Sequence, residues 1–87
     1  MANFLITYDL NKSGQDYPGL YKAIKALGEN IHPLQNVWFV RSTETSGEIR
    51  DALQDHVDSN DKIFVTLVSK WSSYRLGSTN ADWLNGK

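Results

Sequence analysis

Near the start of the chain, side chains that would share one face of a strand are apolar at every second position, which predicts a strand over residues 3–9. Phe4, Ile6 and Tyr8 fall on one face of this strand, and the other face starts apolar and ends in Asp9. Because both faces are apolar for most of the length, we expect a central strand that is covered on both sides.

Two later segments have the spacing of amphipathic helices. Beyond a polar, turn-favouring loop at residues 10–16, an apolar stripe predicts a helix over residues 17–27. Thr45 and Glu48 stand three residues apart, as in a capping box, and apolar residues at helical spacing follow them. This pattern predicts a second helix over residues 46–57.

Segments rich in β-branched and aromatic residues predict three further strands, at 31–35, 37–42 and 62–69. The polar pair Gln35-Asn36 separates the first two, which indicates a tight connection between neighbouring antiparallel strands.

The C-terminal segment is too apolar for a free terminus, since it carries Trp71, Trp83 and Leu84. Residues 71–76 predict a short edge strand, and Ser78 is placed to cap a brief terminal helix. We expect this tail to pack onto the fold or across to a partner chain.

The element order is strand, helix, strand, strand, helix, strand, which is the split βαβ arrangement of ferredoxin-like domains. The sequence therefore predicts a single α+β domain over residues 1–87: a four-stranded antiparallel sheet, two helices on one face, and a short C-terminal strand and helix. The other face of the sheet needs a cover. A second copy can supply it, which predicts a homodimer.

Composition removes several classes of function. The 87 residues include no cysteine, so disulfides, thiolate zinc sites and thiol catalysis are excluded. No apolar run approaches the roughly 20 residues that cross a bilayer, which predicts a cytoplasmic protein without a membrane partner. The formal net charge is -1. Nucleic-acid binding would therefore depend on a local basic patch, a metal ion or oligomerisation.

Asp9 is the candidate for chemistry, because a carboxylate stands where a strand meets a loop. On one interpretation it accepts hydrogen bonds from the loop amides of Asn11 or Lys12 and only shapes the turn. On the other, two copies meet in a dimer and share a magnesium ion, which one or two carboxylates can hold. His32 and His56 have no spacing that links them to Asp9, and we interpret both as structural or surface residues.

Four basic residues are candidate phosphate contacts: Lys12, Arg41, Lys70 and Arg75. Scattered solvated charges are the alternative interpretation. Aromatic strand residues such as Trp38 and Phe39 have the chemistry to stack on bases. Adjacent strand residues point in opposite directions, however, so one of the two must face the core. We expect these aromatic residues to serve the core and a dimer contact.

Three segments resemble the CRISPR-associated Cas-two family. The first strand ends in Tyr8-Asp9-Leu10, and residues 34–40 (LQNVWFV) are similar to that family's Gln-x-Ser-Val-Phe hairpin segment. An acidic turn at 58–61 followed by KIFVTLV is similar to its last turn and fourth strand.

The resemblance implies a ferredoxin-like homodimer, which in some members cuts RNA or DNA with magnesium and in others is an adaptor in spacer integration. It implies that Asp9 is the metal-binding and catalytic position. A related branch, the virulence-associated protein D ribonucleases, shares the fold. The chain departs from the family pattern at Val37, which replaces a serine, and in residues 10–16, which hold one lysine and no arginine.

Two classes of function follow as hypotheses. The first is a Cas-two-like homodimer that acts as a magnesium-dependent endonuclease on RNA or DNA, or as its inactive, nucleic-acid-associated relative. The second is a non-catalytic dimeric interaction or adaptor module of the same fold. A small-ligand regulatory domain is a third hypothesis, and the absence of a ligand-binding motif in the sequence counts against it.

Overall fold

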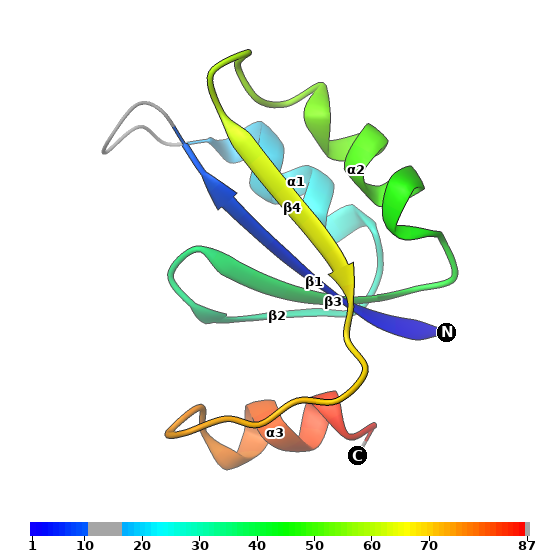
Figure 1. The fold of residues 1–87 in the computed structure, drawn as a ribbon, viewed down its shortest axis with the longest axis vertical. Coiled ribbons are helices and arrows are strands. Elements are labelled where there is room, and N and C mark those ends of the chain that lie inside the picture. Colours follow the sequence, from blue (N-terminus) through cyan, green and yellow to red (C-terminus); the bar gives the residue numbers. More distant parts are fainter. Residues whose placement is uncertain (11–16, 87) are drawn as a thin grey trace.

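The computed structural model describes residues 1–10 and 17–86 and has the predicted α+β architecture (Figure 1). The strands are β1 (Ala2–Asp9), β2 (Asn30–Leu34), β3 (Val37–Ser42) and β4 (Lys62–Leu67), and the helices are α1 (Pro18–Ala26), α2 (Ser46–Gln54) and α3 (Ser78–Leu84). The sheet order is β2-β3-β1-β4 with every neighbouring pair antiparallel, which is the ferredoxin-like topology.

The main core lies between the sheet and the helices α1 and α2. β1 is a central strand, and its residues Phe4, Ile6 and Tyr8 are buried as their alternation predicted. The opposing helices contribute their apolar stripes, chiefly Leu20, Ile24, Ile49 and Leu53. Burial of such side chains is the main favourable term in folding.

The predicted capping box starts α2. The Glu48 amide donates to the Thr45 hydroxyl oxygen at 3.1 Å, and the Thr45 amide donates to a Glu48 carboxylate oxygen at 2.9 Å. Two amides that have no partner within the helix are thereby satisfied. α2 ends at Gln54, three residues before the predicted end, and Val57 still packs against the core.

The β2–β3 hairpin turns at Gln35-Asn36, as predicted. Its register shifts between Ile31 and Leu34, so these residues, although three apart, both stand opposite residues of one face of β3. Such a bulge adds a residue on one strand and changes the direction of the side chains that follow. Because of this bulge, Leu34 as well as Ile31 places its side chain on the face of the sheet that points away from the helices.

Two predictions for the C-terminal segment are wrong. Residues 71–76 do not form a strand, and Ser78 does not cap α3: it is the first residue of that helix, and Gly77 occupies the capping position with φ 99°. The segment leaves the sheet after one further backbone bond, from the Val68 amide to the Asn3 carbonyl at 2.9 Å. It packs onto its own chain, which is one of the two expected arrangements.

Within residues 1–10 and 17–86, no helix has the length and apolar character needed to cross a membrane.

Candidate functional site

The face of the sheet turned away from α1 and α2, hereafter the open face, is built by alternate residues of all four strands. Side chains directly opposite each other in an antiparallel pair share a face, so the register sorts these residues into rows. The rows are Asn3–Arg41, then Thr66–Leu5–Phe39–Ile31, then Phe64–Thr7–Val37–Leu34, and finally Lys62–Asp9. The open face is therefore polar at both ends and largely apolar in the middle.

Asp9 stands at one end of this face, as the last residue of β1 opposite Lys62, the first residue of β4. Both residues are exposed and border a shallow hollow that Phe64 also lines. The cross-strand neighbours have opposite charges, and no ion pair joins these two side chains. The amides of Asn11 and Lys12, which are the alternative partners predicted for Asp9, lie outside the described residues. The same holds for the Lys12 side chain, which is a candidate phosphate contact.

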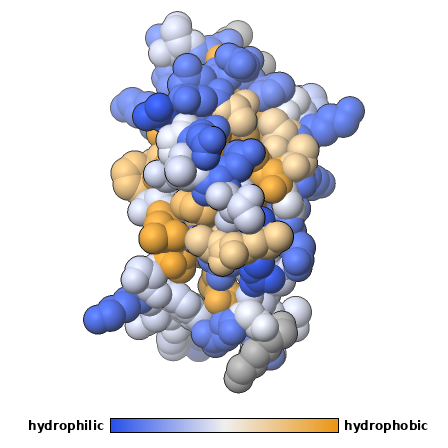
Figure 2. Space-filling view, turned by 90° about the vertical axis from the view of Figure 1, so that its right-hand side faces the viewer, coloured by the Kyte–Doolittle hydropathy of each residue, from blue (hydrophilic) through white to orange (hydrophobic). Residues whose placement is uncertain are grey.

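The middle of the open face reaches the surface beside Asp9. Phe64 is 62% exposed and Leu34 is 51% exposed, which is unusual for large apolar side chains on a sheet. In the space-filling view, apolar residues reach the surface around the middle of the molecule, with hydrophilic residues toward its two ends (Figure 2). Exposed apolar patches of this kind mark interaction surfaces.

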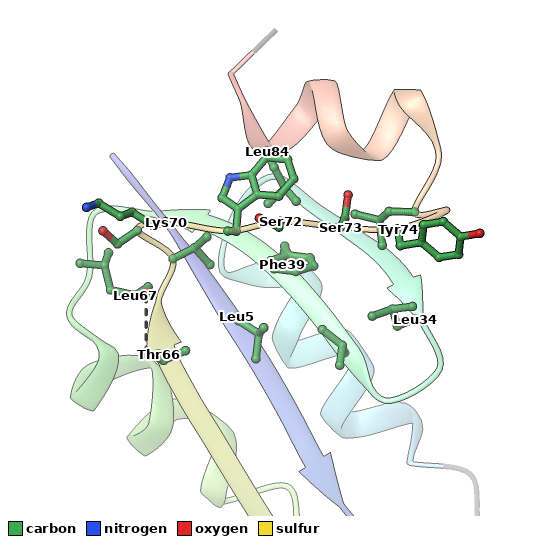
Figure 3. A pocket seen from close by; sticks show the side chains of 15 residues that line it. Leu5, Leu34, Phe39, Thr66, Leu67, Lys70, Ser72, Ser73, Tyr74 and Leu84 are labelled. Atoms are coloured by element: carbon green, nitrogen blue, oxygen red, sulfur yellow. Dashed lines mark hydrogen bonds between the residues drawn. The ribbon is translucent and has the colours of Figure 1, made fainter.

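The other end of the open face is covered by the C-terminal segment, residues 68–86, hereafter the strap. It crosses the ends of the strands above Leu5 and Phe39 and carries α3 (Figures 1 and 3). Phe39 is only 8% exposed and Leu84 of α3 only 7%. Strap and sheet enclose a groove of about 490 Å³, which Leu5, Val37, Phe39, Trp71 and Leu84 help to line.

Arg41 fastens the strap to the sheet. Its Nε donates to the Asn3 side-chain oxygen at 3.0 Å, and one Nη donates to the Trp83 carbonyl oxygen. Its guanidinium also lies 4.1 Å from the centre of the Trp83 ring, and Glu29 lies 3.5 Å from the second Nη. Arg41 is therefore engaged in holding the strap, where sequence reasoning had made it a candidate phosphate contact.

Asn3, which sequence reasoning did not select, completes this fastening. Its side-chain amide donates to the Leu84 carbonyl oxygen at 3.0 Å. The carbonyls of Trp83 and Leu84 end α3, and a helix C-terminus favours donors and positive charge. Asn3 and Arg41 thus cap the helix from the sheet. The sequence signal for this role is that both residues alternate with apolar positions along their strands, which places them on one face of the sheet.

The remaining basic candidates lie on the strap. Lys70 and Arg75 are exposed, and the Arg75 guanidinium lies 5.1 Å from the centre of the exposed Tyr74 ring. The strap contacts the start of β1, whereas Asp9 is at its end. A single chain therefore does not bring these candidates beside Asp9.

The opposite, helix-covered face carries two buried aromatic residues, Trp38 and Tyr8, with the exposed His32 beside them. Trp38 donates its Nε1–H to the Tyr8 hydroxyl at 3.2 Å, and the His32 ring stacks on Trp38 with centroids 3.9 Å apart. His32 Nε2 lies 2.9 Å from the Gln35 carbonyl oxygen, so that nitrogen carries a proton. Burial raises the pKa of Tyr8 above 10.0, a change that the Trp38 hydrogen bond opposes. These contacts stabilise the β2–β3 hairpin.

The described acidic groups of one chain do not gather into a metal site by themselves. Among residues 1–10 and 17–86, no three His, Cys, Asp or Glu side chains gather as metal ligands. Asp9 can offer one carboxylate, and magnesium is commonly held by one or two carboxylates with waters and phosphate oxygens. A pair of Asp9 carboxylates at this position requires a second copy of the chain.

No protein-family model matches the chain, and no solved structure matches it. Function has to be inferred from the site, because a ferredoxin-like fold hosts many unrelated activities.

Proposed function

We propose that the chain functions as a Cas-two-like homodimer in which two open faces pack together and two copies of Asp9 border one cleft. In this proposal the dimer hydrolyses RNA or DNA phosphodiesters with magnesium. The observation that carries it is the position of Asp9, exposed at the end of a face whose adjacent row includes the exposed Phe64 and Leu34.

The apolar row supports the assembly. Large apolar side chains gain free energy when they leave water, at about 25 cal/mol per Å² of surface removed. Phe64 and Leu34 stand at opposite ends of one row, with Thr7 and Val37 between them, so a second sheet can cover the whole row. Sheets that pack face to face in this way form stable layers.

The Asp9 pair supports the chemistry. Two carboxylates brought close repel each other, and a divalent cation removes that repulsion. A bound magnesium ion would activate water and neutralise charge that develops on the phosphodiester. Lys62, one strand away from Asp9, is available to attract a phosphate group toward the same end of the face.

The second candidate function is a non-catalytic dimeric adaptor. A specific observation favours it: Asp9 stands opposite Lys62, whose ammonium can neutralise the carboxylate without a metal ion.

Cleavage assays with pure protein separate these candidates. Single-stranded RNA and duplex DNA are incubated with magnesium or manganese, with and without EDTA, and products are resolved on gels. The Asp9→Asn variant keeps the shape of the side chain and removes its charge, and Asp55→Asn, at an exposed carboxylate after α2, is the matched control.

A nuclease predicts metal-dependent products from the unmodified chain and from Asp55→Asn, with none from Asp9→Asn. Equal product from all three proteins indicates a contaminating nuclease, and the absence of product from all three leaves the adaptor as the supported function.

A further inference from the structure

Few polar contacts hold the strap to the sheet, although the strap is a long segment. Its polar attachments to the sheet converge on one pair of residues, Asn3 and Arg41, which are directly opposite each other on β1 and β3. The backbone contact at Val68 continues the edge of the sheet before the strap departs. Beyond these contacts, residues 68–77 have no regular structure.

Packing between the strap and the sheet is incomplete, although it buries Phe39 and Leu84. A groove of about 490 Å³ lies between them, and Leu5, Phe39 and Leu84 line it without filling it (Figure 3). Each gap forfeits dispersion contacts, since the attraction between two atoms falls steeply with separation. The strap therefore gains less from its seat on the sheet than a well-packed helix would gain.

The strap also occupies the same surface that a second copy needs. It covers the row that contains Phe39, whereas the next row, in which Phe64 and Leu34 are exposed, is largely uncovered. A sheet from another chain that packed over both rows would collide with α3 and residues 71–76.

We propose that the strap is a removable cover of the open face, that Arg41 is its latch, and that release of the latch opens the covered row to a second copy of this chain. This inference rests on the proposed homodimer and adds its regulation. With the strap closed, the copies meet through the uncovered row alone, and with the strap open they meet through both rows.

The strength of association then depends on how often the strap is open. Apparent affinity is reduced in proportion to the fraction of molecules in the competent state, and each of the two copies must open. A change that weakens the latch raises this fraction. It should strengthen dimerisation, whereas the loss of a merely structural contact should leave dimerisation unchanged or weaken it.

The test compares Arg41→Met, which keeps the aliphatic stem and removes the charge and donors, with Arg50→Met, at an exposed arginine of α2 whose partner is Asp51. Trp83→Leu is a second way to release the latch, because it removes the ring under the guanidinium. Dimer dissociation constants are measured by sedimentation over a range of concentrations. Hydrogen exchange of peptides that cover residues 78–86 reports strap opening in dilute, monomeric samples.

We expect Arg41→Met and Trp83→Leu to accelerate exchange in residues 78–86 while α2 stays protected. We also expect both to lower the dimer dissociation constant about tenfold or more, which corresponds to about 1.4 kcal/mol. Arg50→Met should change neither quantity.

Faster hydrogen exchange in residues 78–86 together with unchanged or weaker dimerisation would show that the strap opens but does not compete with the second copy. That result overturns this inference and leaves the homodimer standing. Unchanged exchange in both variants overturns the role of Arg41 as latch. If sedimentation finds only monomers in every sample, including the unmodified protein, the homodimer and this inference are overturned together.

Discussion

Tyr8 shows how one buried hydroxyl links the fold to pH. It accepts a hydrogen bond from Trp38, and burial favours its neutral form, which raises its pKa above 10.0. An acid whose pKa is raised by folding adds stability below its unfolded pKa and loses that stability as the pH rises through the folded value.

We therefore expect Tyr8→Phe to lower the free energy of unfolding by about 1 kcal/mol at neutral pH, through the lost hydrogen bond. Because phenylalanine cannot ionise, the difference between the two proteins should shrink above a pH of about 10. Urea unfolding at pH 7 to 11 measures it. A constant difference across that range would contradict this account of Tyr8.

Gly28, which follows α1, is a residue whose lack of a side chain matters. Its φ is 149°, and a Cβ there would collide with the backbone carbonyl oxygen of Arg41. Gly28→Ala should therefore destabilise the fold by about 2 kcal/mol or more. Gly47, in the first turn of α2, is the matched control, since a Cβ there meets nothing closer than 3.9 Å.

Gly47→Ala should leave stability equal or improve it by roughly 0.5–1 kcal/mol, because alanine favours a helix. Thermal melts of both variants measure the contrast. Similar losses at the two positions would show that backbone crowding at Gly28 is unimportant.

At the scale of elements, the capping box makes a sharp prediction. Thr45→Ala removes the acceptor of the Glu48 amide, so we expect a loss of about 1 kcal/mol in unfolding free energy. Thr43→Ala, two residues earlier in an exposed bend, is the control and should change stability little. Denaturant titrations compare the two, and equal effects would refute a specific cap.

Local patterns were sufficient to predict most elements. The alternation of residues 3–9 and the stripe within 17–27 are set by which side meets the core, so the sequence carries that information directly. β3 has the predicted bounds, and α1, β1 and β2 differ by one residue at their ends. A capping box is equally local, and its spacing was enough to place the start of α2.

The strap was less predictable because its conformation depends on contacts distant in sequence. Residues 71–76 have strand-like composition, yet no strand edge is paired with them, and they instead cross the open face. Asn3 and Arg41 are far apart in sequence, and their joint hold on α3 follows from strand register. The location of Asp9 at a strand end was predictable, whereas its neighbour Lys62 required the register of β4.

At the scale of the whole molecule, the open face predicts association. Phe64→Ser removes the most exposed aromatic residue of the apolar row, and Phe64→Leu keeps the position apolar as its control. We expect the serine variant to raise the dimer dissociation constant by about tenfold or more and the leucine variant to change it much less. Light scattering of the 9.9 kDa chain over a micromolar range measures both. A single-chain mass for the unmodified protein would refute the prediction.

One end of the open face carries the Arg41 cation and the other carries the opposite charges of Asp9 and Lys62. In the proposed homodimer, this difference bears on which two-fold axis the stacked pair adopts. An axis along the strands brings like ends together, so that the Asp9 carboxylates meet each other. An axis across the strands instead sets Asp9 of one copy over the Asn3–Arg41 end of the other. Without a divalent cation the crosswise axis avoids carboxylate repulsion, and with one the lengthwise axis is favoured. A metal ion would then select the geometry of the assembly before it took part in any reaction.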